Sequence, residues 1–304
     1  MNIQWYPGHM TKARRAMKED MKLIDLVIEL VDARVPFSSR NPDIDELAAG
    51  KARMVLLNKA DLADEAKNAA WAALFESRGI HVAKIDARNK GSLKQVQAVI
   101  QEACKEKIER DRRRGILNRP IRTMVVGIPN VGKSTFINSF AGKACAKTGN
   151  KPGVTKGNQW IRLNKTLELL DTPGILWPRF EDQTVGLHLA LIGSINDQIL
   201  NREELAWELI GLLEQIYPGV LTERYGDAAE GETDNSAWKE LSKEEQNLKA
   251  SRMLERIAKN RACLMKGGEL DLARASALLL DEFRSGKLGK LSLEQAQDYT
   301  DRVK

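Results

Sequence analysis

The sequence is poor in the residues that build disulfide frameworks and soft-metal sites. Its 304 residues include three cysteines and three histidines. The cysteines, at positions 104, 145 and 263, are isolated and odd in number, with no C-x-x-C pair. We therefore expect reduced thiols, as in a cytoplasmic protein, and see no pattern typical of a zinc site.

Long apolar runs are also missing. No run approaches the roughly 20 residues that a membrane-spanning helix needs, and residues 1–20 lack the apolar segment and small-residue cleavage site of a secretory signal. The Pro7-Gly8 break and Glu19-Asp20 argue against a transit peptide. With 42% apolar and 30% charged residues, the composition is that of a globular chain with enough mass for one large or two medium domains.

Short apolar runs alternate with helix-like stretches in the first part of the chain. The runs are 26–31, 54–57, 81–85, 123–126 and 167–170, and the helix-like stretches are 65–78, 93–108 and 134–140. This alternation predicts an α/β domain with a mostly parallel sheet covered on both faces, which binds ligands at the carboxyl ends of its strands. Residues 105–122 are expected to form an exposed basic connection.

Beyond Pro178 the strand pattern stops. Residues 203–217, 244–265 and 271–283 look helical, with Ser242 or Asp271 at a helix start. We expect residues 1–178 to form the α/β domain, including a basic N-terminal helix, and residues 181–304 to form an all-helical second domain.

Residues 127–134 read Gly-Ile-Pro-Asn-Val-Gly-Lys-Ser and match the phosphate-binding pattern G-x-x-x-x-G-K-[ST]. They follow a predicted strand and precede a predicted helix, so their backbone N–H groups are expected to converge on phosphate oxygens. Lys133 would reach the β- and γ-phosphates, and the Ser134 hydroxyl would bind Mg²⁺. The residues expected at the phosphates are Asn130, Val131, Gly132, Lys133, Ser134 and Thr135.

Residues 58–61 read Asn-Lys-Ala-Asp, and this N-K-x-D tetrapeptide selects GTP over ATP. Asp61 is an acceptor-only side chain that suits the guanine N1–H and exocyclic amine, whereas adenine would leave its charge unpaired. Asn58 would brace the loop and the base edge. Lys59, followed by Ala60, would cover the ring face with its stem.

Three further segments complete the guanine-nucleotide pattern. Asp86-Ala87 occupies the place of the last guanine loop, where Ser usually precedes Ala, so backbone N–H groups rather than the Asp86 side chain are expected to bind the base. Residues 171–174 match D-x-x-G: Asp171 would hold Mg²⁺ through water, and the Gly174 N–H would sense the γ-phosphate. Thr155 is expected to close the Mg²⁺ shell from switch I and to act with Lys133 in catalysis.

The guanine motifs precede the phosphate motifs along the chain, which is the reverse of the familiar order. The sequence therefore predicts a circularly permuted P-loop G domain, because a permutation preserves spatial neighbours when the original termini are close. It also places the helical domain a few residues after Gly174. Loss of the γ-phosphate should then act directly on that domain.

The permuted order, the opening Trp5-Tyr6-Pro7-Gly8-His9-Met10 and the segment Asp32-Ala33-Arg34-Val35-Pro36 resemble the YlqF/RbgA family, ribosome biogenesis GTPase A. The resemblance spans nearly the whole chain. It implies a GTPase that acts on late assembly intermediates of the large ribosomal subunit.

The usual water-orienting Gln after D-x-x-G is replaced by Ile175, so intrinsic hydrolysis should be slow and stimulated by the ribosomal subunit. His9, on a Pro-Gly turn before a basic helix, is our candidate for the missing group, ahead of His81 and His188. Asn130 resembles an asparagine that helps related GTPases to bind K⁺, a cation that could stand in for an arginine finger.

Basic residues gather in the first helix, in residues 105–122 and along one predicted face of the helix at 244–265, in a chain of net charge +6. Phosphate contacts by such patches would give salt-dependent rRNA binding, with no membrane or DNA partner expected. The candidate RNA contacts are Lys12, Arg14, Arg15, Lys18, Lys249, Arg252, Arg256 and Lys259. A signalling switch with a protein effector and a catalytically idle GTP sensor are the alternatives.

Overall fold

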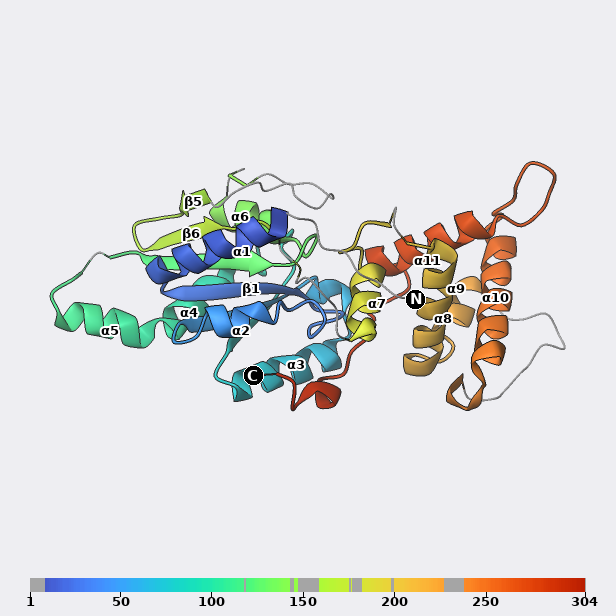
Figure 1. The fold of residues 1–304 in the computed structure, drawn as a ribbon, viewed down its shortest axis with the longest axis horizontal. Coiled ribbons are helices and arrows are strands. Elements are labelled where there is room, and N and C mark those ends of the chain that lie inside the picture. The colour runs from blue at the N-terminus through green and yellow to red at the C-terminus, as the bar shows by residue number, and fades with distance from the viewer. Residues whose placement is uncertain are drawn as a thin grey trace.

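The computed structural model describes residues 9–117, 119–142, 145–146, 159–174, 176, 182–197, 200–226 and 238–303, without the side chains of 9–14 and 239. Its first part is an α/β domain and its second part is helical (Figure 1). None of the helices in these ranges is both long enough and apolar enough to span a bilayer.

One six-stranded sheet forms the centre of the α/β domain. The strands are β1 (Leu26–Asp32), β2 (Ala52–Asn58), β3 (His81–Ile85), β4 (Ile121–Gly127), β5 (Gln159–Arg162) and β6 (Leu167–Asp171). Their spatial order is β3-β2-β1-β4-β6-β5, and all neighbours are parallel except the antiparallel pair β5–β6. The strand that leads into the phosphate-binding loop, β4, is fourth in the chain but central in the sheet, as a permuted G domain requires.

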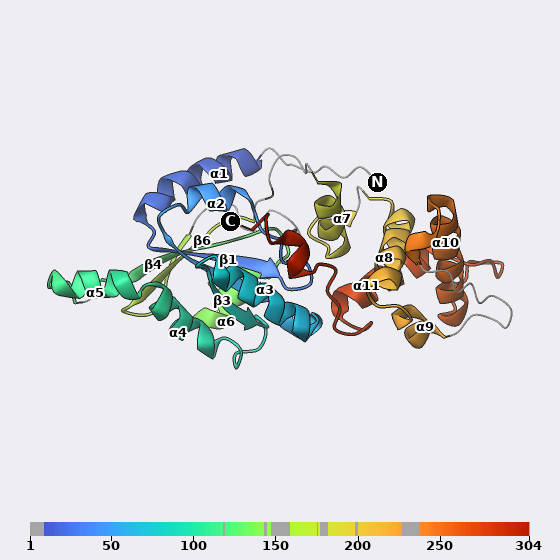
Figure 2. The same cartoon turned by 90° about the horizontal axis from the view of Figure 1, so that it is seen from below.

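Helices cover both faces of this sheet. They are α1 (His9–Asp20), α2 (Asp43–Leu47), α3 (Glu65–Ser77), α4 (Lys94–Ala103) and α6 (Lys133–Ala141), with 3₁₀ turns η1 (Met21–Leu23) and η2 (Ala60–Leu62). Helix α5 (Lys105–Arg113) follows α4 and projects away from the sheet (Figure 1). Seen from below, α1 and α2 lie on one side of the strands and α4 and α6 on the other (Figure 2). The fully buried Trp71 and Phe75 of α3 join the apolar cluster of Val31, Val55 and Leu57.

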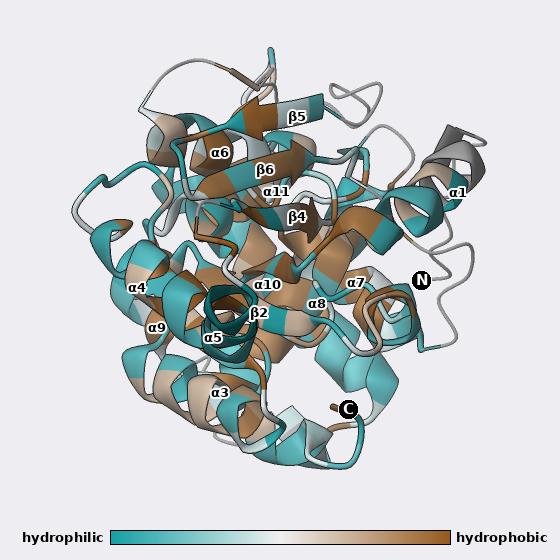
Figure 3. Cartoon of the chain, turned by 90° about the vertical axis from the view of Figure 1, so that its left-hand side faces the viewer, coloured by the Kyte–Doolittle hydropathy of each residue, from teal (hydrophilic) through white to brown (hydrophobic). Residues whose placement is uncertain are grey.

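The helical part contains α7 (Gln183–Leu191), α8 (Arg202–Ile216), α9 (Val220–Tyr225), η4 (Trp238–Glu240), α10 (Lys243–Asn260) and α11 (Leu272–Ser285). Helices α8, α10 and α11 pack against one another through fully buried residues such as Leu209, Leu254 and Leu279. Ser242 forms a capping box with Glu245 at the start of α10, and the Asp271 side chain caps α11. Apolar residues line the strands and the inner helix faces, and polar residues cover the outside (Figure 3).

The last residues return to the α/β domain. Leu291 N–H donates to the carbonyl of Leu62 at 3.1 Å, and Leu293 N–H donates to that of Arg34 at 2.8 Å. In η5 (Ala296–Tyr299), Tyr299 stacks on Phe37 with ring centroids 4.4 Å apart. Residues 291–303 therefore form a tail that runs from α11 across the loops after β1 and β2.

The predicted fold class, a permuted G domain followed by helices, is confirmed, with several differences in detail. Residues 105–122 are not simply a connection, because 105–113 form helix α5. Cys104 separates α4 from α5 within the single predicted helix 93–108. Strand β5 and the returning tail have no counterpart among the predicted elements.

Candidate functional site

The nucleotide motifs lie together at the carboxyl edge of the sheet. Asn58 ends β2 and pairs in register with Asp32 at the end of β1, while Gly127 ends β4 beside Leu30. Asp171 ends β6, next to Val125 of β4. Since the central strands are parallel, the loops that follow them share one edge, where an α/β sheet binds its ligand.

The phosphate-binding loop, residues 127–134, needs glycine where it approaches residues 58–61, which we call the guanine loop. Gly132 has a φ of +97°, and a Cβ there would lie 2.5 Å from the Asn58 amide nitrogen. Helix α6 begins at the next residue, Lys133. The loop thus delivers a helix N-terminus to the carboxyl edge, an arrangement suited to phosphate.

Lys133 and Asp171 face each other below this loop. The Lys133 ammonium donates to the Asp171 carboxylate at 2.6 Å, and both side chains are buried. Burial lowers the pKa of Lys133, and the attraction of Asp171 partly opposes that shift. Ser134 follows in the first turn of α6 and is half-buried.

The D-x-x-G segment lies against the phosphate-binding loop. A Cβ on Gly174 would meet the backbone of Pro129 at 3.1 Å, so any larger residue would push the two loops apart. The Thr172 hydroxyl donates to the carbonyl of Val125 at 2.8 Å. Thr155 and Ile175 lie outside the described residues.

Asn58 connects three loops. Its amide nitrogen donates to the carbonyl of Val131 at 2.7 Å, and its amide oxygen accepts from Ala87 N–H at 3.0 Å. The phosphate-binding loop, the guanine loop and the loop after β3 are therefore held in a fixed relation by one buried side chain.

The carboxylate of Asp61 is half engaged. One oxygen accepts from the Arg88 guanidinium at 2.7 Å. The other oxygen is buried and has no hydrogen-bond partner within the part of the chain that the structure describes. A buried acceptor of this kind suits a ligand that presents N–H groups. Ala60 and Asp61 lie in η2, behind Lys59 with its left-handed φ of 59°.

Asp86 directs its carboxylate into its own turn. It accepts from Arg88 N–H at 2.9 Å and from the Arg88 side chain at 3.0 Å. The Ser92 hydroxyl closes the same turn by donating to the Asp86 carbonyl at 2.7 Å. The side chain at position 86 is thus occupied within its own loop.

Asn130 joins the phosphate-binding loop to the helical part. Its backbone is left-handed, with φ 60°, and its amide nitrogen donates to the carbonyl of Gly193 at 2.8 Å. Gly193 follows α7, so a residue predicted to bind K⁺ also contacts the second domain.

The candidate histidines and basic residues lie away from this edge or outside the described side chains. His9 begins α1, but its side chain, like those of Lys12 and Arg14, lies outside the described atoms. Arg15, Lys18, Arg252 and Lys259 are exposed, whereas Lys249 and Arg256 are half-buried. His81 is half-buried in β3.

His188 is buried in a cluster that the motifs do not reveal. Its Nδ1 lies 3.0 Å from a Glu294 carboxylate oxygen and 3.1 Å from the Ser38 hydroxyl. Glu294 also accepts from Phe37 N–H at 2.7 Å. The cluster joins α7, the loop after β1 and the tail, which are far apart in sequence.

The nucleotide motifs contribute few side chains that could bind a metal ion. No group of three or more His, Cys, Asp or Glu side chains within the described ranges could hold a metal ion. The donors at the phosphate-binding loop are a hydroxyl and a carboxylate, from Ser134 and Asp171. Hard oxygen donors few in number suit Mg²⁺, which takes its remaining ligands from phosphate and water.

Comparison with known proteins agrees with this geometry. Residues 122–210 match the family model described as 50S ribosome-binding GTPase. The chain is 47% identical to ribosome biogenesis GTPase A of Bacillus cereus over 100% of this chain and 97% of that protein. It is 32% identical to the protein of that name from Thermotoga maritima, over 98% and 96% of the two chains.

Solved structures show the same fold. GDP-bound YlqF superposes with a TM-score of 0.63 and 26% identity, covering 93% of this chain and 99% of that one. GNP-bound YlqF from T. maritima gives a TM-score of 0.60. The chain therefore belongs to the ribosome biogenesis GTPase A (YlqF/RbgA) family, and it is a GTPase that serves ribosome assembly.

Proposed function

We propose that this GTPase binds a precursor of the large ribosomal subunit late in its assembly and that the bound nucleotide controls contact with rRNA. The observation that carries this proposal is the hydrogen bond from the Asn130 side chain to Gly193, because it joins the phosphate-binding loop to the helical part. The description of the matching family model, 50S ribosome-binding GTPase, supports the choice of subunit.

Guanine would be held between the loops that Asn58 braces. The free oxygen of Asp61 would accept from the base, and the backbone of Asp86 and Ala87 would approach its other edge. Lys59 and Ala60 would pack against the ring. Arg88, which contacts Asp61, closes the outer side of this site.

The phosphates would lie on the N-terminus of α6, above residues 130–135. Lys133 would turn from Asp171 to the β- and γ-phosphates, and the Gly174 N–H would sense the γ-phosphate. Ser134, Thr155 and Asp171 would hold Mg²⁺, which when bound neutralises charge on the phosphate oxygens.

GTP hydrolysis needs a group that orients the attacking water in place of the usual Gln. We assign this role to His9, at the start of α1, and expect the ribosomal subunit to bring it to the γ-phosphate. A His9→Ala variant should bind GTP normally but lose subunit-stimulated turnover. An unchanged stimulated rate would remove His9 from the mechanism.

K⁺ would bind beside the phosphates through the amide oxygen of Asn130 and supply positive charge there. Turnover should then be faster in KCl than in NaCl, and Asn130→Ala should remove the difference. Equal wild-type rates in the two salts would exclude the cation.

The RNA-facing surfaces would be α1, with Lys12, Arg14, Arg15 and Lys18, and α10, with Arg252 and Lys259 outermost. Lys249 and Arg256 are half-buried, and their charges oppose the rise that burial gives to the pKa of Glu214 in α8. We place this activity in the cytoplasm, where the free thiols of the three cysteines would stay reduced.

Co-sedimentation with large subunits tests the proposal. Binding should be strong with a non-hydrolysable GTP analogue, weak with GDP and reduced by salt, because phosphate contacts release counterions. Nucleotide-independent binding, or none, would contradict it.

A further inference from the structure

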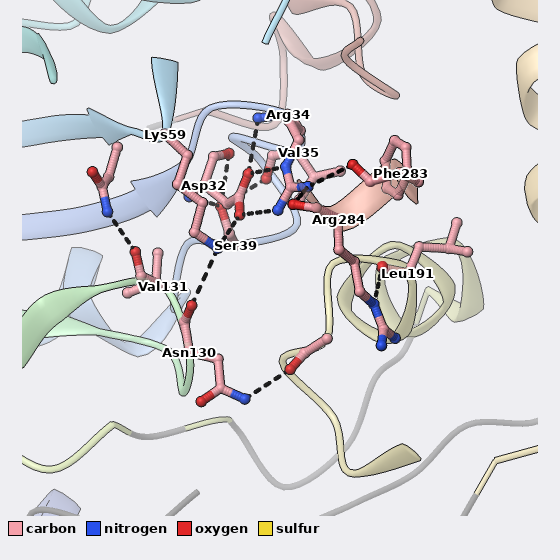
Figure 4. A network of polar contacts seen from close by, with 12 residues as sticks. Asp32, Arg34, Val35, Ser39, Lys59, Asn130, Val131, Leu191, Phe283 and Arg284 are labelled. Carbon is pink, nitrogen blue, oxygen red and sulfur yellow. Dashed lines mark hydrogen bonds and ion pairs between the residues drawn. The ribbon is translucent and has the colours of Figure 1, made fainter. Parts of the chain in front are cut away.

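One buried carboxylate holds two cations behind the guanine loop. The Lys59 ammonium donates to Asp32 at 2.8 Å and to the carbonyl of Asn130 at 3.2 Å. Arg34 binds the same carboxylate through its Nε and Nη2 nitrogens, at 2.8 Å each. Asp32 and Arg34 are 0% and 1% exposed, whereas the Lys59 side chain is 24% exposed at the edge of the cluster, which is drawn in Figure 4.

Attraction between opposite charges holds the cluster together. Burial alone would raise the pKa of Asp32, but Arg34 and Lys59 outweigh it and hold that pKa well below its ordinary range. Burial lowers the pKa of Lys59, and Asp32 opposes that shift. Removing one member would leave its partners charged and buried, which is costly.

The remaining arm of Arg34 reaches the helical part. Its Nη1 donates to the carbonyl of Arg284 at 3.1 Å and lies 3.4 Å from that of Phe283, and its guanidinium stacks over the Phe283 ring. These carbonyls end α11, where a helix has no N–H donors of its own for its last carbonyl oxygens and carries partial negative charge. Arg34 therefore caps α11 from inside the G domain.

Arg284 continues the connection to the loop after α7. Its side chain donates to the carbonyls of Leu191 at 2.9 Å and Ala190 at 2.8 Å. Gly193, which accepts from Asn130, packs against the same guanidinium. The end of α11 is thus tied to the guanine loop through Arg34 and to the phosphate-binding loop through Gly193 (Figure 4).

We propose that Arg34, acting through Asp32 on Lys59, is a positioning residue that couples guanine-nucleotide binding to the docking of α11 on the G domain. Arg34 is not in contact with the proposed guanine site itself, and the inference rests on that site. Coupling is reciprocal: a nucleotide that orders Lys59 stabilises the docked helix, and the docked helix favours the nucleotide.

The test compares full-length Arg34→Met and Arg34→Lys with the wild type by steady-state GTPase kinetics. Arg34→Met should raise the KM for GTP about tenfold, within the usual range of coupling between sites. Its kcat should stay unchanged, because the cluster meets the base side of the site. Arg34→Lys keeps the charge but not the planar, forked guanidinium, so its KM for GTP should lie between those of Arg34→Met and the wild type.

Hydrogen exchange gives a second measurement. GDP should increase the protection of backbone amides in 283–286 of the wild type, and Arg34→Met should abolish the increase. Arg224→Met is the matched control, since Arg224 binds Glu282 of the same helix at 2.8 Å without reaching Asp32. Arg224→Met should leave unchanged both the KM for GTP and the increase in protection that GDP causes in residues 283–286.

The outcomes separate the coupling from its premise. A purely structural role for Arg34 would lower the active fraction, and so kcat, at unchanged KM, and that result would overturn the proposal. If Arg34→Met does not fold, Arg34→Lys decides alone: a wild-type KM with wild-type protection would refute it. Failure of the wild type itself to bind GDP would instead refute the guanine site.

Discussion

Asp61 is the residue on which base selection should depend, because one of its oxygens is buried without a partner in the described part of the chain. Asp61→Asn replaces that acceptor with a group that can donate, which suits the carbonyl of xanthine better than the amine of guanine. Loss of a charge-assisted hydrogen bond should weaken GDP about a hundredfold. Xanthosine diphosphate (XDP) should bind to Asp61→Asn more tightly than it binds to the wild type.

Fluorescence titration with labelled GDP and XDP measures both effects. Asp86→Asn is the control: Asp86 also binds Arg88 but within its own turn, so its removal should change either affinity less than about threefold. Equal losses in the two variants would show that base selection lies elsewhere.

Asp32 also governs acid stability at the residue scale. Its pKa in the folded protein is held below the ordinary value of 3.8 by Arg34 and Lys59. The unfolded chain therefore binds more protons than the folded one below that pH, so the stabilisation is present above about pH 4 and is lost as the pH falls further. Urea titrations should show a steeper loss of unfolding free energy from about pH 5 to 3 in the wild type than in Asp32→Asn. Equal slopes would contradict this assignment.

At the scale of elements, the helices and strands that could be predicted are those with a local signal in the sequence, such as an apolar run or a capping residue. β1 to β4 and β6 each carry an apolar run, and Ser242 and Asp271 mark their helix starts as predicted. β5 was missed because it buries one of its four residues, Ile161, and so lacks such a run. The motif residues followed from their spacing, whereas the contact of Arg34 with Arg284 crosses 250 positions and leaves no local signal.

Helix α10 supports a prediction about RNA. Arg252 and Lys259 are exposed on it, and each phosphate contact contributes about 0.9 to the slope of log affinity against log salt for duplex nucleic acid. Replacing both by Gln should reduce that slope by about 1 to 2 in subunit binding. Lys287→Gln with Lys290→Gln removes the same charge from exposed residues beyond α11 and should leave the slope unchanged. An equal drop in both double variants would indicate a general charge effect.

At the scale of the whole molecule, the tail fastens the helical part to the G domain. Glu294 is 1% exposed and accepts from the backbone N–H groups of Phe37 and Ser38 while it contacts His188 of α7. Three segments that share no local sequence therefore depend on one carboxylate. Replacing Glu294 should therefore weaken the cooperativity between the unfolding of the two parts more than it lowers the stability of either part.

Glu294→Ala leaves the backbone N–H groups of Phe37 and Ser38 and the Ser38 hydroxyl without their carboxylate acceptor, which should cost about 3 kcal/mol. Scanning calorimetry should show the single wild-type transition lowered in temperature and divided in two, with GDP raising the G-domain transition more than that of the helical part. Glu294→Gln keeps an acceptor oxygen and should lie between the alanine variant and the wild type. If Glu294→Ala unfolds in one transition at the wild-type temperature, the two parts are held together by the Arg34 cluster and the remaining tail contacts instead.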